Sequence, residues 1–261
     1  MSAVEVRPVQ VHAVVSGRAD GPAVVLSNSL GSTHRMWDAQ LAALEERFRV
    51  VRYDTRGHGE SPVPEGPYTI DDLADDVIAL LDRLDIERAH LVGLSLGGMT
   101  MMRVAARNPE RVNRIALLCT GAQLPPREAW LDRAATVRAN GTGAVAESVV
   151  QRWFTPEYLS TYGSSRTFHE NMVAATPAEG YASCCEVIAE MDLRDDLSSI
   201  AAPTLAIAGA DDPATPPAKL EEIADNVQQG RLLVVPDSAH LANAQQPDII
   251  NPALIEHLEQ Q

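Results

Sequence analysis

The sequence predicts an α/β protein built around a mostly parallel β-sheet. Short, continuous apolar runs recur in the first 121 residues and return after residue 200, and helical patterns separate most of them. Such runs are typical of strands that are buried on both faces of a parallel sheet, and their alternation with helices indicates right-handed βαβ units. A chain of 261 residues, 45% hydrophobic and 22% charged, is long enough for one such domain with an inserted subdomain.

The apolar runs give the order of the expected strands. An edge strand is expected at residues 9–15, where the pattern alternates, and further strands at 22–27, 49–53, 89–92, 114–119, 204–208 and 232–235. Between the strands, the spacing of Leu41, Leu44 and Phe48 predicts a helix. A longer helix is expected after Thr69, because Thr69 followed by Asp72 three residues later can form a capping box.

Residues 122–195 differ from the rest of the chain. They contain no comparable strand run, but they contain helical stretches around 128–138, 144–154 and 181–191. We therefore expect an α/β core formed by residues 1–121 and 196–261, with a helical cap formed by residues 122–195. Such a cap would cover the carboxyl ends of the strands, where ligands bind in open α/β sheets.

The stretch Gly93-Leu94-Ser95-Leu96-Gly97 lies between the expected strand at 89–92 and a helical pattern that Pro109 ends. This is the context of a G-x-S-x-G elbow, in which a strained serine exposes its hydroxyl and the glycines let strand and helix approach closely. The alternative is a glycine-rich turn without chemistry. Ser95 is therefore a candidate nucleophile that needs a base and an acid nearby.

A serine hydroxyl reacts when a base takes its proton and a third group orients that base. Of the seven histidines, His34 and His58 lie in loops after strands, whereas His240 follows the last expected strand and fits best. The acid should follow the preceding strand, where Asp211 and Asp212 are neighbours. The three groups would then meet at one edge of the sheet.

Asp54 also follows an expected strand, in the polar turn Asp54-Thr55-Arg56-Gly57-His58-Gly59. It precedes Ser95 in the chain, whereas the order expected for this architecture is serine, acid, histidine. We therefore expect Asp54 to be a structural turn residue that is bonded locally, near Arg56 and His58.

An acyl transfer also needs hydrogen-bond donors for the developing oxyanion. One should be the backbone N–H of Leu96, directly after the candidate nucleophile and at the start of a helix. The other should come from the loop after the strand at 22–27, where we select Leu30. Since both donors are backbone groups, the side chains can be ordinary leucines.

The amino-acid composition restricts which molecules the protein can bind and where in the cell it is expected. The net charge of −15, from 21 basic and 36 acidic residues, disfavours nucleic acid and anionic membranes, but a local arginine can still bind a small anion. An odd number of cysteines, Cys119, Cys184 and Cys185, predicts reduced thiols in a cytoplasmic protein, with the adjacent pair buried on a helix rather than joined as a disulfide. No signal-peptide pattern and no apolar run of membrane-spanning length are present.

With these residues assembled, the chain resembles the α/β-hydrolases over nearly its whole length, and more narrowly the 3-oxoadipate enol-lactonases. The segments that carry the resemblance are 27–31 with Met36-Trp37, 53–59, 93–99 and 239–243. The narrower signal is Ser27-Asn28-Ser29-Leu30-Gly31, because most relatives carry His-Gly in place of Asn28-Ser29. The resemblance favours Asp212 over Asp211 as the acid, because Gly-x-x-Asp-x-x-Thr-Pro is the usual form of that loop.

The resemblance implies a hydrolase of aromatic catabolism that opens 3-oxoadipate enol-lactone to 3-oxoadipate through a serine acyl-enzyme, with no metal and no organic cofactor. The carboxylate of this small anionic lactone needs a cationic partner. We expect Arg133, one helical turn from Trp130, to bind it, with Trp153 lining the pocket. The alternative, that Arg133 and Trp153 only hold the cap together, stays open.

Other functions remain possible on the same residues. A carboxylesterase or a carbon–carbon-bond hydrolase would use the same triad with another pocket, and a small-molecule receptor would keep the triad while signalling through ligand binding. Turnover of p-nitrophenyl acetate that is lost in Ser95→Ala separates an enzyme from a receptor. Ultraviolet loss of the enol lactone separates the enzymes from one another.

Overall fold

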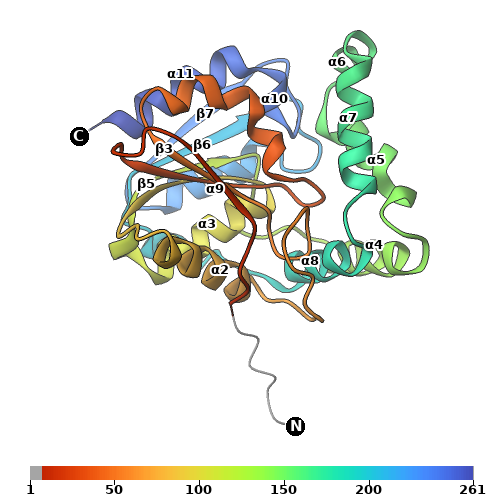
Figure 1. Cartoon of the computed structure of the whole chain (residues 1–261). Coiled ribbons are helices and arrows are strands. Elements are labelled where there is room, and N and C mark those ends of the chain that lie inside the picture. Colours follow the sequence, from red (N-terminus) through yellow and green to blue (C-terminus); the bar gives the residue numbers. More distant parts are fainter. Residues whose placement is uncertain (1–7, 261) are drawn as a thin grey trace.

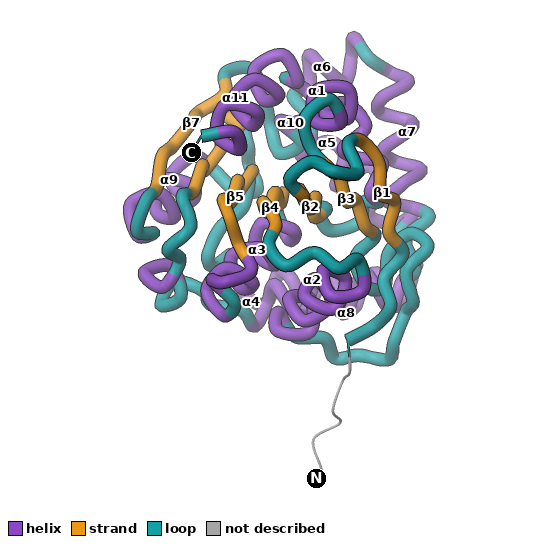
Figure 2. Tube along the Cα trace, turned by 60° about the vertical axis from the view of Figure 1, so that its left-hand side comes forward, coloured by secondary structure: helices purple, strands orange, loops and turns teal. Residues whose placement is uncertain are grey.

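A seven-stranded β-sheet forms the centre of the computed structural model, which describes residues 8–260. The strands are β1 (Ala13–Gly17), β2 (Ala23–Ser27), β3 (Arg49–Tyr53), β4 (Ala89–Leu94), β5 (Val112–Leu118), β6 (Thr204–Gly209) and β7 (Gly230–Val235). Their spatial order is β1-β3-β2-β4-β5-β6-β7. β1 runs antiparallel to β3, and the other neighbouring pairs are parallel. These pairings confirm the predicted mostly parallel sheet, and Figure 2 shows its strands in orange.

The first strand begins later than predicted. It starts at Ala13, which pairs with Tyr53, and not at residue 9. The segment before it leaves the sheet because its backbone groups bond elsewhere: the N–H of Val11 donates to the carbonyl of Val9, and the N–H of Val9 donates to the carboxylate of Asp76 at 2.7 Å. The predicted edge strand is therefore right in type and displaced in position.

Helices cover both faces of the sheet. Figure 1 shows α2 (Ile70–Arg83) and α3 (Leu96–Arg107) on one face and α11 (Pro247–Glu259) on the other. The other core helices are α1 (Leu41–Glu45), α9 (Pro217–Asn226) and α10 (Ala242–Gln245), with 3-10 turns at His34–Gln40, Pro109–Arg111 and Leu197–Ser199. The predicted capping box of α2 is confirmed, since Thr69 and Asp72 bond each other's backbone N–H groups at 2.8 and 3.1 Å.

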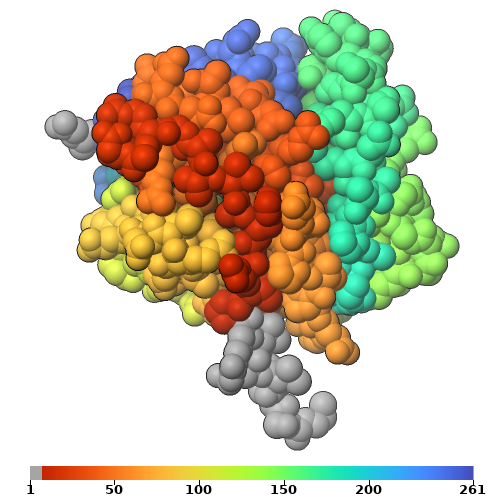
Figure 3. All heavy atoms as spheres, in the orientation of Figure 1, coloured from red at the N-terminus to blue at the C-terminus, as the bar shows by residue number. Residues whose placement is uncertain are grey.

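Five helices lie between β5 and β6 in the chain. They are α4 (Arg127–Asn140), α5 (Gly143–Trp153), α6 (Pro156–Thr161), α7 (Gly163–Ala174) and α8 (Ala178–Glu190). They stand to one side of the sheet in Figure 1, and the space-filling view shows them packed against the core (Figure 3). We call these five helices the insert. The division of the chain at residues 122 and 195 stays a prediction.

Helices α6 and α7 lie outside the predicted helical stretches. The apolar residues of α7 are too sparse to give a clear helical stripe, but the start of α6 carried a readable signal. Thr155 caps α6 by accepting a hydrogen bond from the N–H of Tyr158, and Pro156 takes its first position. A proline also opens α9, which the pattern missed in the same way.

The buried residues agree with the predicted buried strands and buried thiols. The inner strands β2, β4 and β6 are buried at every residue. All three cysteines are buried free thiols, and Cys184 and Cys185 lie in α8, as predicted. Within residues 8–260, no helix combines the length and the apolar character needed to cross a membrane.

Candidate active site

A cavity of about 140 Å³ lies between the carboxyl ends of the strands and the insert. We call it the Ser95 cavity. The residues that line it come from both parts: Ser29, Leu30, Ser95, Pro213, Ala214, Thr215 and His240 from the core, and Leu124, Trp130, Arg133, Val149, Arg152, Trp153 and Tyr181 from the insert and the chain leading to it. The predicted residues Ser95, His240, Leu30, Arg133 and Trp153 therefore share one cavity.

Ser95 occupies the sharp turn between β4 and α3, with φ 56° and ψ −119°. This left-handed conformation is costly for a residue other than glycine and is stored at functional turns. A Cβ on Gly93 would overlap the carbonyl of Gly97, and a Cβ on Gly97 would overlap the carbonyl of Ser27. The two glycines are therefore required for the close approach of strand and helix, as the elbow pattern predicts.

His240 and Asp212 are hydrogen-bonded at the same edge of the sheet. Nδ1 of His240 lies 2.8 Å from Oδ2 of Asp212, and both side chains are buried. Thr215 supports the carboxylate with its hydroxyl, at 2.5 Å from Oδ2, and with its backbone N–H, at 3.1 Å from Oδ1. The neighbouring Asp211 is exposed. Of the two candidate acids, Asp212 is the one that contacts the imidazole.

The environment keeps Asp212 ionised. Burial by itself would raise the pKa of this carboxyl, but the adjacent His240 and the hydrogen bonds from Thr215 outweigh burial and lower the pKa to about 2. A carboxylate bonded to Nδ1 leaves Nε2 as the imidazole nitrogen that can take a proton. Across residues 8–260, no hydrogen bond joins this imidazole to Ser95. Contacts between a nucleophile and its base often shorten only when substrate binds.

The two candidate oxyanion donors are unoccupied by other contacts. Within the described chain, the backbone N–H of Leu30 and that of Leu96 make no hydrogen bond. Leu96 is the first residue of α3, where N–H groups have no partner inside the helix. Leu30 lines the Ser95 cavity. Both donors are therefore available to an anion formed beside Ser95.

His58 supports the loop that carries Leu30. Its Nε2 accepts a hydrogen bond from the N–H of Gly31 at 3.0 Å, so the proton of the ring must be on Nδ1, which lies 3.2 Å from the carbonyl of Arg56. Burial lowers the pKa of His58 to about 4, against the opposite effect of the Arg56 carbonyl and Asp54. His58 is thus a neutral imidazole in this loop and does not line the cavity.

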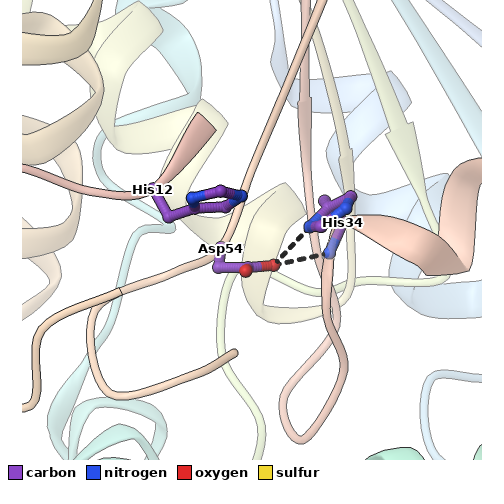
Figure 4. Close-up of side chains that lie close together, drawn as sticks. All are labelled: His12, His34 and Asp54. Carbon is purple, nitrogen blue, oxygen red and sulfur yellow. Dashed lines mark hydrogen bonds and ion pairs between the residues drawn. The ribbon is translucent and has the colours of Figure 1, made fainter. Parts of the chain in front are cut away.

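Asp54 is bonded within its own turn, as predicted, and also to a second loop that the prediction did not include. Its Oδ1 accepts hydrogen bonds from the backbone N–H of His34 at 2.8 Å and from Nδ1 of His34 at 3.0 Å (Figure 4), and its Oδ2 accepts one from the N–H of Glu60. Arg56 instead pairs with Asp76 at 2.6 Å. Asp54 is a structural residue, as expected, and it joins its own turn, through Glu60, to the loop that carries His34.

His12 lies beside this pair, with its ring centre 5.6 Å from that of His34. The possible ligand atoms of His12, His34 and Asp54 lie within 4.8 Å of one another. Both oxygens of Asp54 already accept hydrogen bonds from the protein, so we assign this cluster to loop anchoring. His34, the other histidine considered as a base, is committed to Asp54.

The arginines of the insert divide into two groups. Arg127, Arg138 and Arg166 each form ion pairs with glutamates of the insert. Arg133 and Arg152 line the Ser95 cavity, and neither has a carboxylate within ion-pair distance in residues 8–260. Arg133 was selected from the sequence and Arg152 was not, and Trp130 was used there only to place Arg133. Trp130 and Tyr181 also line the cavity. The signal for Tyr181 is the segment Gly180-Tyr181, which also resembles the enol-lactonases but gives no role for the side chain.

A parallel α/β sheet with a serine on a strained strand-to-helix turn, and a histidine–aspartate pair at the same edge, is the arrangement of serine hydrolases of the α/β class. A family model described as alpha/beta hydrolase fold matches residues 22–247. The chain belongs to the α/β-hydrolase family and is an enzyme.

Comparison with individual proteins shows which α/β-hydrolases this chain is similar to. The chain is 42% identical to 3-oxoadipate enol-lactonase 2 of Acinetobacter baylyi, over 91% of this chain and 89% of that protein. The crystal structure of the enol-lactonase from Burkholderia xenovorans is similar with a TM-score of 0.94 and 40% identity, covering 96% of each chain. A thermophilic esterase from Thermogutta terrifontis has a TM-score of 0.90 and 30% identity, covering 95% of this chain and 92% of that one.

Proposed function

We propose that the protein hydrolyses 3-oxoadipate enol-lactone to 3-oxoadipate, as a cytoplasmic enzyme of aromatic catabolism. The observation that carries the proposal is the Ser95 cavity, which holds Ser95 and His240 together with arginines that lack acidic partners. It is supported by 42% identity over 91% of the chain to a 3-oxoadipate enol-lactonase. The substrate is a small lactone that carries one free carboxylate.

In the first half-reaction Ser95 Oγ attacks the ring carbonyl carbon, and Nε2 of His240 takes the hydroxyl proton. The backbone N–H groups of Leu30 and Leu96 stabilise the tetrahedral oxyanion, a contribution of about 2.7–4 kcal/mol for one such donor in other enzymes. The bond between the carbonyl carbon and the ring oxygen then breaks. The leaving enolate takes the proton from His240 and becomes the ketone, which leaves an acyl group on Ser95.

In the second half-reaction a water molecule attacks the acyl carbon while His240 takes one of its protons. The bond to Ser95 Oγ breaks and His240 returns the proton to the serine. The released carboxylic acid gives its remaining proton to solvent, so the product is 3-oxoadipate with two carboxylates. Asp212 holds the imidazole in the required tautomer and stabilises its protonated form. Every proton that His240 accepts is returned, so neither step needs a metal or an organic cofactor.

The carboxylate of the lactone is assigned to Arg133. This guanidinium lines the cavity and stacks over the ring of Trp130 at 4.6 Å, so the aromatic face positions it. Trp153 is buried beside it and forms part of the cavity wall. An ionic contact at the far end of the substrate would fix the position of the ring carbonyl over Ser95.

The decisive experiment is a direct assay. The enol lactone is generated from muconolactone or carboxymuconolactone with upstream enzymes, and its ultraviolet absorbance is followed. The protein should accelerate the loss far above buffer, and Ser95→Ala should abolish the acceleration. Arg133→Ala should raise KM for this lactone, whereas unchanged KM and kcat would refute its assignment. No acceleration by the wild-type protein would refute the lactonase.

A general carboxylesterase is the second candidate. It is favoured by the similarity to the Thermogutta terrifontis esterase, at 30% identity and a TM-score of 0.90. The same cavity and triad would serve it without the arginines. A kcat/KM that is higher for neutral p-nitrophenyl esters than for the lactone would support this candidate.

A further inference from the structure

Two arginines line the Ser95 cavity, and no acidic residue lines it with them. Arg133 comes from α4 and Arg152 from α5. Burial, and then the nearby charge of Arg133, lower the pKa of Arg152, as expected for two cations that line one cavity. In a protein of net charge −15 that pairs its other insert arginines with glutamates, this arrangement favours an anionic ligand.

A buried hydroxyl points to the same ligand. Tyr181 of α8 is 0% exposed and lines the cavity. Arg133 lies close enough to act on its hydroxyl, but no contact of hydrogen-bond geometry satisfies Oη among the described residues. A buried hydroxyl in this state is destabilising until a ligand or water completes its hydrogen bonding. Burial raises the pKa of Tyr181, against the opposite effect of Arg133 and Arg152, so the group is a neutral O–H donor.

Apart from the nearby hydroxyl of Tyr181, no hydrogen-bond acceptor among the described residues contacts the guanidinium of Arg133. Its guanidinium stacks on the ring of Trp130, whose Nε1 is bonded to the carbonyl of Leu124 at 2.9 Å. Stacking positions the cation through its flat face and consumes none of its N–H groups. Two guanidinium groups and one phenol therefore offer hydrogen-bond donors to a cavity that supplies no carboxylate acceptor.

We propose that Arg152 and Tyr181 complete a carboxylate subsite with Arg133, and that Arg152 determines specificity for substrates whose acyl portion ends in a free carboxylate. The proposal deepens the proposed function and rests on it for the position of the scissile carbonyl at Ser95. A guanidinium binds a carboxylate through two parallel N–H bonds, and the second guanidinium and the phenol can donate to the remaining lone pairs. The ligand class is a short-chain dicarboxylate or its half-ester.

Binding is tested without catalysis. Adipate, a saturated six-carbon dicarboxylate, is titrated by calorimetry into the Ser95→Ala protein, with hexanamide as the neutral probe. Adipate should bind and hexanamide should not. In this background Arg152→Gln should weaken adipate binding at least about tenfold, and Tyr181→Phe should weaken it several-fold.

The matched control is Arg166→Gln, which removes an insert arginine that is paired with Glu147 and Glu170 and does not line the cavity. It should leave adipate affinity unchanged. Equal affinity in Arg152→Gln and its parent, or no adipate binding by the parent, would overturn the subsite. Thermal unfolding of each variant shows whether it is folded.

Kinetics separate the subsite from the lactonase. On the mono-p-nitrophenyl ester of adipic acid, Arg152→Gln should raise KM about tenfold or more with kcat little changed, and on p-nitrophenyl acetate KM should stay the same. Arg152→Lys should restore part of the affinity. Failure of the wild-type protein on the enol lactone, with this discrimination intact, would refute the lactonase alone. Lactone hydrolysis that is indifferent to Arg152→Gln would refute the subsite alone.

Discussion

The backbone N–H of Gly31 donates to Nε2 of His58 at 3.0 Å, and this contact fixes the loop next to Leu30. His58 stands in the strand-end turn that made it a candidate base, but its Nε2 is an acceptor within the protein. Its burial and lowered pKa of about 4 keep it neutral at pH 7. A histidine considered for proton transfer is thus a positioning residue for a candidate oxyanion donor.

Replacing His58 by alanine should lower kcat about tenfold or more. The loss should stay smaller than the roughly 10²–10³-fold fall in kcat that follows deletion of an oxyanion donor in other enzymes. The reason is that the N–H of Gly31 loses its acceptor and the Leu30 loop its anchor. KM should change less than kcat, and His58→Gln, which offers an acceptor again, should recover part of the loss. The measurement is steady-state turnover of p-nitrophenyl acetate well below the unfolding temperature. A kcat equal to that of the wild type would contradict this role.

Asp212→Asn and Asp211→Asn form a matched pair of neighbouring changes. Asp212 bonds Nδ1 of His240 at 2.8 Å, and an amide there favours the wrong tautomer, so kcat should fall by roughly 10³–10⁴. Asp211 is exposed, and its backbone N–H bonds the carbonyl of Ser238. Asparagine keeps this backbone bond, so kcat of Asp211→Asn should stay within about twofold of the wild-type value. The reverse ranking in turnover would move the acid to Asp211.

Stability should decline when the pH falls below about 6.5. Burial lowers the pKa of His58, His90 and His257 to about 4, from the usual 6.5 of a histidine in water. Between these values the unfolded chain binds more protons than the folded one, so their contribution is complete above pH 6.5 and is lost on lowering the pH towards 4. Each histidine adds a slope of up to about 1.4 kcal/mol per pH unit. The lowered pKa of Asp212 also makes stability fall with pH, but only between about pH 3.8 and pH 2.

Urea unfolding at pH 7, 6 and 5 measures this slope. His257→Gln should flatten it, because glutamine can keep the hydrogen bond to the carbonyl of Ile115 without titrating. A free energy of unfolding that is the same at pH 7 and pH 5 would show that these histidines are not buried as neutral groups.

The sequence predicted what depends on local pattern and chain order. The elbow at Ser95 follows from five consecutive residues, and the position of His240 follows from the end of a strand. The end of the preceding strand left Asp211 and Asp212 as alternatives, and the resemblance to the hydrolases selected Asp212. Pairing between distant segments was not predictable in the same way. Arg138 reaches Glu179 across 41 positions, so no local pattern distinguishes a paired arginine from the unpaired Arg152. The contact of Asp54 with His34 was missed for the same reason, since His34 comes from another loop.

Gln245 joins the loop that carries His240 to the insert. Its Oε1 accepts from the N–H groups of Ala239 and Thr155, and its Nε2 donates to the hydroxyl of Thr155 at 2.6 Å and to the carbonyl of Asp237 at 3.0 Å. The N–H of Leu241 also donates to the carbonyl of Trp153 at 2.8 Å. One amide side chain therefore sets the imidazole loop against the end of α5, which carries Arg152 and Trp153.

Gln245→Ala should lower kcat/KM about tenfold, since both the base and the cavity wall lose a common support and small displacements of reacting groups are costly. Gln246→Ala is the matched control, because this neighbour makes one side-chain bond, to the carbonyl of Asp237, and should stay within about twofold. The assay is hydrolysis of the mono-p-nitrophenyl ester of adipic acid across pH 6 to 9. A loose imidazole loop should lower kcat at every pH, and a displaced wall should raise KM. If both variants lost activity equally, the carbonyl of Asp237 would be the important contact and the bridge to Thr155 would have no role in catalysis.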